Sequence, residues 1–123
     1  FKRMLVGSDL QCGHRVGLTP PKYQSAIQGK KYHRIQVETW KRYTEIVDRL
    51  KPIDIYVMNG DCVDGKGVRS GGTELITPDM GRQADMAAEC ILYAKAKTGI
   101  IVRGPLITFH RVGKIGKILS LTR

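Results

Sequence analysis

The 123-residue sequence has no hydrophobic run near the roughly 20 residues that a membrane-spanning helix needs. It also lacks the basic and then apolar segments of a secretory signal peptide. None of its three cysteines is in a C-x-x-C pair, and an odd number cannot all pair within one chain. These absences favour free thiols in a reducing compartment and no membrane partner. A cysteine-ligated metal is the weaker alternative, because Cys12 and Cys62 each follow a candidate ligand.

Acidic residues are scarce, because 11 Asp and Glu stand against 21 Lys and Arg, which gives a formal charge of +10. The segment Gly104–Arg123 has no acid, and Arg15–Arg42 has only Glu38. This balance favours an anionic partner such as nucleic acid, a nucleotide or phosphate. A solvated basic face is the alternative.

Two nucleotide-binding motifs are also absent. No G-x-x-x-x-G-K-[ST] occurs, and no G-x-G-x-x-G follows the first apolar run. Their glycine-rich backbones cradle phosphates at a helix N-terminus. The sequence therefore argues against a P-loop domain and against a dinucleotide-binding domain.

Hydrophobic periodicity predicts alternating strands and helices. Short apolar runs predict strands over Arg3–Gly7, Ile53–Met58 and Ile100–Val102. Apolar residues at three- and four-residue steps predict a helix over Lys31–Leu50, and Pro78 is expected to open a second helix that runs to about Lys97. The order β-α-β-α-β is typical of α/β proteins with a parallel sheet and right-handed crossovers.

Long loops follow the first two predicted strands, over Leu10–Lys30 and Cys62–Thr77. Loops of this length inside a compact domain are usually functional or mobile. Lys51-Pro52 and Gly99 are expected to end the two helices. Because ligands of parallel sheets gather at the carboxyl ends of the strands, we expect the site to lie at these loops.

Carboxylates stand at the ends of the first two strands. Asp9 lies in "VGSDLQCGH", and Asp61 and Asp64 lie in "NGDCVDG". Two carboxylates three residues apart are costly unless a cation neutralises them. Adjacent parallel strands bring their carboxyl ends to one edge, so the pattern predicts a divalent cation there, or a two-metal centre. An ordinary Asx turn is the alternative.

The two blocks "SDLQCGHRVGLTPP" and "NGDCVDGKGVRSGGTELIT" resemble the calcineurin-like metallophosphoesterases, most closely a phage-type branch. That family carries D-x-H, G-D-x-x-D and G-N-H-[ED] at successive strand ends, and the resemblance spans Arg3 to about His110. It implies Asp9 as the first metal ligand, Asp61 as the bridging carboxylate and Asp64 as a loop-supporting aspartate. His110 would be the proton donor near the leaving group, or else a lone surface histidine.

The sequence departs from the family pattern in three places. Gln11 stands where D-x-H has its histidine, and His14, three residues later, is a second candidate ligand. The segment "GPLITFH" matches the third block only in part, and no later G-H-x-H is present. A glutamine oxygen suits manganese or magnesium better than zinc or iron. We therefore expect Mn²⁺ first, with Zn²⁺, iron or Mg²⁺ as alternatives, in a centre that is dinuclear in the intact family.

The resemblance implies the α/β half of a metallophosphoesterase-type sandwich over residues 1–110, followed by a basic tail or final strand over 111–123. The chain begins with Phe1 rather than methionine, so we expect a trimmed or partial chain. The expected location is the cytoplasm of a bacterial or phage-infected cell. The oligomeric state is left open.

The expected activity is metal-dependent hydrolysis of a phosphoester, with a phosphodiester related to nucleic acid as substrate. Arg15, Lys66 and Arg69 lie in the two long loops and are candidates for binding phosphate oxygens, although loop solubility alone also explains them. The competing hypothesis is an inactive fragment or relative that binds anions or nucleic acid without catalysis.

Overall fold

The computed structural model describes residues 2–24, 29–67, 70–102 and 109–112. Its sheet has the order β1-β2-β3-β4. The strands are β1 (Met4–Gly7), β2 (Ile55–Asn59), β3 (Thr98–Val102) and β4 (Phe109–Val112), and the helices are α1 (Lys30–Leu50), α2 (Met80–Tyr93) and the short 3-10 helix η1 (Pro21–Tyr23). The first three strands are parallel, and β4 is antiparallel to β3. The predicted α/β class with parallel strands is confirmed.

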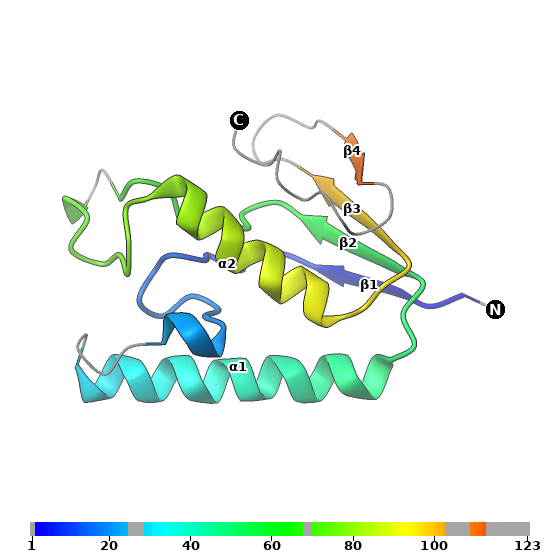
Figure 1. Cartoon of the computed structure of the whole chain (residues 1–123), viewed down its shortest axis with the longest axis horizontal. Coiled ribbons are helices and arrows are strands. Elements are labelled where there is room, and N and C mark those ends of the chain that lie inside the picture. The colour runs from blue at the N-terminus through cyan, green and yellow to red at the C-terminus, as the bar shows by residue number, and fades with distance from the viewer. Residues whose placement is uncertain (1, 25–28, 68–69, 103–108, 113–123) are drawn as a thin grey trace.

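The core lies between the sheet and the two long helices, which Figure 1 shows on the same side of the strands. Tyr56, Met58 and Ile101 point into this core and are at most 4% exposed. They pack with Val47 of α1 and with apolar α2 side chains that include Met86. Because successive strand residues alternate between faces, every second side chain of β2 and β3 is buried here.

The opposite face of the sheet also carries apolar side chains. Met4 and Val6 of β1 are 60% and 59% exposed. Their parallel partners Ile55 and Val57 on β2 are half-buried. Within the described residues, this face is therefore apolar and has no layer of helices over it (Figure 1). None of the described helices combines the length and apolar character that crossing a membrane demands.

Helix α2 is shorter than the sequence predicts. It begins at Met80 rather than Pro78, because the Asp79 carboxylate caps it by accepting hydrogen bonds from the backbone N–H groups of Gly81 (2.9 Å) and Arg82 (3.2 Å). It ends at Tyr93, and Lys95 then turns the chain with a left-handed φ of 49°. The prediction that Gly99 ends this helix is wrong.

Strand β3 begins earlier, and strand β2 later, than the sequence predicts. Gly99 lies inside β3 and pairs with Tyr56. The strand begins early because the backbone N–H groups of Lys97 and Thr98 donate to the carbonyls of Ile53 (3.3 Å) and Asp54 (3.0 Å). Strand β2 begins two residues after the predicted Ile53. The turn residues Ile53 and Asp54 instead hold the amino ends of the neighbouring strands.

Strand β4 crosses the boundary placed at residue 110, after which the sequence analysis expected a basic tail or a final strand. Its backbone register sets His110 opposite Ile101. The rest of the expected basic tail or final strand, residues 113–123, lies outside the described residues.

Asp54 joins three strands at the amino end of the sheet. Its carboxylate accepts a hydrogen bond from the backbone N–H of Arg3 (2.9 Å) and lies 3.4 Å from Nζ of Lys97. Its own backbone N–H donates to the Arg3 carbonyl at 3.0 Å. The Arg3 N–H, followed by the Lys97 ammonium, holds the pKa of Asp54 below its ordinary value of 3.8.

We expect Asp54→Asn to lower the free energy of unfolding at neutral pH. A carboxyl whose pKa falls on folding adds stability above its unfolded pKa of about 3.9, and this is lost as the pH falls through the folded value. The difference in the free energy of unfolding between wild type and variant should therefore become smaller below about pH 4. Urea denaturation from pH 7 to pH 3 measures it, with the exposed α2 residue in Asp85→Asn as control. A constant difference across this range would contradict the assigned role.

Candidate functional site

The loops after β1 and β2 continue the parallel pairing of the strands beyond their ends. The backbone N–H groups of Asp9, Gln11 and Cys12 donate to the carbonyls of Gly60 (3.2 Å), Asp61 (3.1 Å) and Cys62 (3.0 Å). The N–H of Asp64 donates back to the Cys12 carbonyl at 3.0 Å. These bonds hold the two predicted ligand loops side by side at the carboxyl edge of the sheet. We call this arrangement the paired loops, Asp9–Cys12 with Gly60–Asp64.

Three predicted ligand residues adopt left-handed backbone conformations in the paired loops. The φ angles are 55° at Asp9, 49° at Gln11 and 52° at Asp61. Non-glycine residues in this region cost roughly 1–3 kcal/mol each and cluster at functional sites. Aspartate tolerates the conformation better than most residues, because its short side chain can bond locally. The Ser8 hydroxyl donates such a bond to the Asp9 carboxylate at 2.9 Å.

The first loop folds back on itself into a compact unit. The backbone N–H of Leu18 donates to the Leu10 carbonyl at 2.9 Å, which closes the loop. Gly17 lies against the chain inside it, since a Cβ added there would be 2.1 Å from the carbonyl oxygen of Gln11. Glycine is required at this close approach of backbone to backbone.

Gln83 of α2 ties both loops to the core. This fully buried side chain accepts from the N–H of Gly65 (2.9 Å) and donates to the carbonyls of Gly65 (2.9 Å) and Thr77 (2.8 Å). Gly13 lies directly over it, with φ of 105°, and a Cβ there would be 2.4 Å from the Gln83 side chain. A glutamine on the buried side of α2 thus replaces water as the partner of loop backbone groups.

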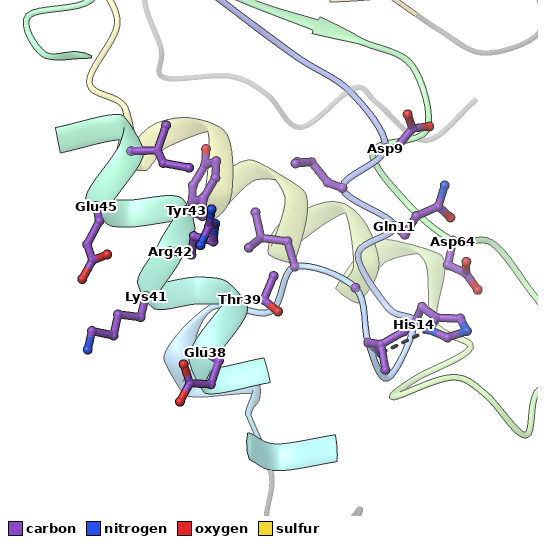
Figure 2. A pocket seen from close by; sticks show the side chains of 15 residues that line it. Asp9, Gln11, His14, Glu38, Thr39, Lys41, Arg42, Tyr43, Glu45 and Asp64 are labelled. Atoms are coloured by element: carbon purple, nitrogen blue, oxygen red, sulfur yellow. Dashed lines mark hydrogen bonds between the residues drawn. The ribbon is translucent and has the colours of Figure 1, made fainter. Parts of the chain in front are cut away.

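An open groove of about 880 Å³ separates the first loop from α1 (Figure 2). Its sheet-edge wall carries the polar residues Asp9, Gln11, His14 and Asp64 and the apolar residues Leu10, Val16 and Leu18. Its α1 wall runs from Glu38 to Ile46. Of the predicted metal ligands, Asp9, Gln11, His14 and Asp64 therefore share one cavity wall. Asp61 is exposed beside Gln11 and is not part of this wall.

The predicted ligands are gathered at one edge without forming a dense cluster. In the part of the chain that the structure describes, no group of three or more His, Cys, Asp and Glu side chains is placed to hold a metal ion. Asp9 and Asp61 are exposed, and Asp64 is half-buried. The oxygens of Asp9, Gln11 and Asp64 are hard donors of the kind that Mn²⁺ and Mg²⁺ accept. They suit a weakly held ion that takes further oxygens from water or a ligand, but not a preformed dinuclear centre.

His14 has both ring nitrogens engaged. Its Nδ1 accepts a hydrogen bond from the backbone N–H of Val16 at 3.1 Å, drawn as a dashed line in Figure 2. Its Nε2 lies 3.5 Å from the carboxylate of Glu74. A neutral imidazole has one donor and one acceptor nitrogen, so Nδ1 accepts and Nε2 carries the proton. As a metal ligand, His14 would have to give up one of these contacts.

Of the predicted phosphate-binding residues, Arg15 and Lys66 do not line this wall. The Arg15 guanidinium lies over the Tyr32 ring, 5.3 Å from its centroid, and Lys66 is exposed on the second loop. Arg69 lies outside the described residues. The side chain of His110 lies outside them as well, although its backbone belongs to β4. These four assignments remain predictions.

The cysteines are free thiols in the structure. Cys12 and Cys90 are fully buried with their sulfurs 3.9 Å apart. Burial raises the pKa of Cys62 to about 11, and the thiol of Cys12 together with burial raises that of Cys90. The Cys62 and Cys90 thiols therefore stay protonated near neutral pH, which makes them poor metal ligands.

The α1 wall of the groove was missed from the sequence. The sequence predicts an amphipathic helix over Lys31–Leu50 and assigns no site to its charged residues. The signal was present, because Glu38, Lys41, Arg42 and Glu45 recur at three- and four-residue steps and so share one side of the helix. What the spacing did not reveal is that this stretch of α1 borders the groove.

Neither the protein-family models nor the curated proteins searched contain a match to this chain.

We expect Gln83→Ala to lower the free energy of unfolding by about 1–3 kcal/mol or more, because it leaves buried backbone groups of Gly65 and Thr77 without partners. The exposed neighbour in Asp85→Ala should change it by less than about 0.5 kcal/mol. Urea denaturation at pH 7 compares the two. Equal effects would show that the hydrogen bonds from Gln83 to Gly65 and Thr77 contribute nothing to stability.

Proposed function

We propose that the chain is a metal-dependent phosphoester hydrolase of the metallophosphoesterase type, acting on a phosphodiester related to nucleic acid. The observation that carries this proposal is the pair of loops at the carboxyl edge of the sheet. Asp9, Gln11 and Asp61 each adopt a left-handed conformation there, next to an open groove. Strained polar residues gathered at this edge of a parallel sheet are typical of a ligand site.

The proposed fold is the α/β half of a metallophosphoesterase-type sandwich. Support comes from the sheet face opposite the helices, where Met4 and Val6 are 60% and 59% exposed. In a sandwich, the face of each sheet that lies away from its helices packs against a second layer. The proposed location is the cytoplasm, which suits the free thiols.

The ion that fits these donors is Mn²⁺ or Mg²⁺, which would be held by the carboxylate oxygens of Asp9 and Asp61, and of Asp64, with the Gln11 amide oxygen. Such an ion, when bound, polarises a phosphoryl oxygen and lowers the pKa of bound water. The chain itself supplies rigidity, since the paired loops and the Gln83 clamp fix the ligands before substrate arrives. Because the ligands are already ordered, binding of an ion does not require the loops to lose conformational entropy.

A second function is favoured by two observations. No group of three or more metal-capable side chains gathers within the described residues, and both His14 nitrogens are engaged, which favours binding of anions or nucleic acid without catalysis. The formal charge of +10 supports such binding equally well. Hydrolysis is what separates the two functions.

We expect the wild-type chain to bind Mn²⁺ and to hydrolyse bis(p-nitrophenyl) phosphate only when Mn²⁺ is present. Asp9→Asn and Asp61→Asn should each weaken Mn²⁺ binding by about tenfold or more, because each replaces a charged ligand by a neutral one. Asparagine also tolerates a left-handed φ, so the folding stability should be unchanged. Isothermal titration with Mn²⁺, release of p-nitrophenol and thermal melting are the measurements.

The matched control is Asp85→Asn, which removes one exposed carboxylate of α2 outside the paired loops. It should behave as wild type in all three measurements. Absence of hydrolysis by every variant, with Mn²⁺ bound, would leave the non-catalytic function. Equal Mn²⁺ affinity of wild type and Asp61→Asn would remove the metal site itself.

A further inference from the structure

Two of the three cysteines face each other inside the core. The sulfurs of Cys12 and Cys90 lie 3.9 Å apart, although the two residues are 78 positions apart in the sequence. Both side chains are fully buried. The third cysteine, Cys62, is half-buried and takes no part in this contact. Of the three pairs that three cysteines allow, the fold therefore brings one pair of thiols together.

The arrangement of the two thiols is close to that of a disulfide. A disulfide holds its sulfurs about 2.0 Å apart, so each sulfur has to move by about 1 Å for the bond to form. Either thiol is oriented to donate a hydrogen bond to the other. The two side chains therefore point toward each other, as a bridge requires.

Oxidation of this pair removes little from the native structure. The Cys12 thiol donates a hydrogen bond to the Leu18 carbonyl at 3.3 Å, and a thiol is a weak donor. The closure of the first loop does not depend on it, because the backbone N–H of Leu18 donates to the Leu10 carbonyl at 2.9 Å. A bridge at Cys12 thus leaves the backbone bond that closes this loop in place.

The pair connects the candidate site to the helix behind it. Cys12 belongs to the paired loops, and its carbonyl accepts from the backbone N–H of Asp64 at 3.0 Å. Cys90 lies on α2, whose Gln83 side chain holds the backbone of the second loop. A bond between the two cysteines attaches the first loop covalently to the element that already fixes the second.

We propose that Cys12 and Cys90 form a redox modification site, which a small-molecule disulfide such as oxidised glutathione converts to an intramolecular disulfide that locks the first loop onto α2. One thiolate of the pair attacks a sulfur of the small disulfide, and one small thiol leaves. The other thiolate then attacks the protein sulfur of the mixed disulfide, and the second small thiol leaves. The protein gives up two electrons and two protons, and the small disulfide takes up both. This assignment goes beyond the proposed function and does not depend on it.

Burial sets the conditions under which the bridge forms. Because both thiols are shielded, the oxidant reaches them when the first loop opens transiently. After the first step, the second thiol lies next to the mixed disulfide, so closure of the bridge is favoured over reaction with more oxidant. A reducing compartment keeps the thiols free, as they are in the structure, and a more oxidising one closes the bridge.

The first test maps the bridge in the full wild-type chain. The protein is incubated with oxidised glutathione at about pH 8, its remaining thiols are blocked with N-ethylmaleimide in denaturant, and it is digested with trypsin without reduction. We expect mass spectrometry to find residues 4–15, which contain Cys12, joined to residues 83–95, which contain Cys90. Residues 50–66, which contain Cys62, should carry N-ethylmaleimide or a single glutathione.

The second test asks whether the bridge holds the first loop. A bond between residues 78 positions apart lowers the conformational entropy of the unfolded chain, so the oxidised protein should melt roughly 5–15 °C above the reduced one. Amide hydrogen exchange of Asp9–Cys12 should slow at least tenfold, and dithiothreitol should reverse both changes. Cys90→Ala should lose both responses. Cys62→Ala removes a thiol outside the pair and should retain them.

Three results would overturn the inference. The first is that N-ethylmaleimide still blocks both Cys12 and Cys90 after oxidation. The second is a bridge that contains Cys62 or joins two chains. The third is a bridge between Cys12 and Cys90 that leaves melting and amide exchange unchanged. The peptide map and the comparison of oxidised with reduced protein use the wild-type chain, so they decide the matter even where Cys90→Ala does not fold.

Discussion

The parallel hydrogen bonding that continues past the ends of β1 and β2 is the constraint on which the site depends. Strand pairing alone would bring two chain ends to one edge and leave the following loops free. Here the bonds from Asp9, Gln11 and Cys12 to Gly60, Asp61 and Cys62 keep the loops in register after the strands have ended. The left-handed residues Asp9, Gln11 and Asp61 themselves take part in these bonds, so the pairing supports their strained backbone.

The rest of the molecule makes this pairing rigid. Cys12 is fully buried against Cys90 of α2, and Gln83 of the same helix holds Gly65 and Thr77 of the second loop. Helix α1 contributes from the other side, because the Gln36 side chain donates to the Arg15 carbonyl at 2.9 Å. Two long loops are thus ordered by buried polar and thiol groups from both helices. The groove between the first loop and α1 is a consequence of that arrangement.

The sequence predicted the order of strands and helices as far as β3 and the meeting of the two aspartate loops at one sheet edge, because both follow from hydrophobic period and from the topology of parallel sheets. It misplaced the start of α2, since Pro78 was interpreted as the first helical residue when Asp79 supplies the cap. It could not decide whether His14 is a metal ligand, because the contacts of His14 with Val16 and Glu74 form only when the loops fold. It missed α1 as a wall of the site, because a charged helix face has the same spacing whether it borders water or a groove.

The central claim is that the paired loops form a cation site at the edge of the sheet. Substoichiometric Mn²⁺ added to isotope-labelled protein broadens the amide resonances near the ion and leaves distant ones sharp. The account predicts selective broadening of residues Asp9–Cys12 and Gly60–Asp64, and its loss in Asp61→Asn. Broadening centred elsewhere, or spread evenly over the acidic residues of the chain, would contradict it.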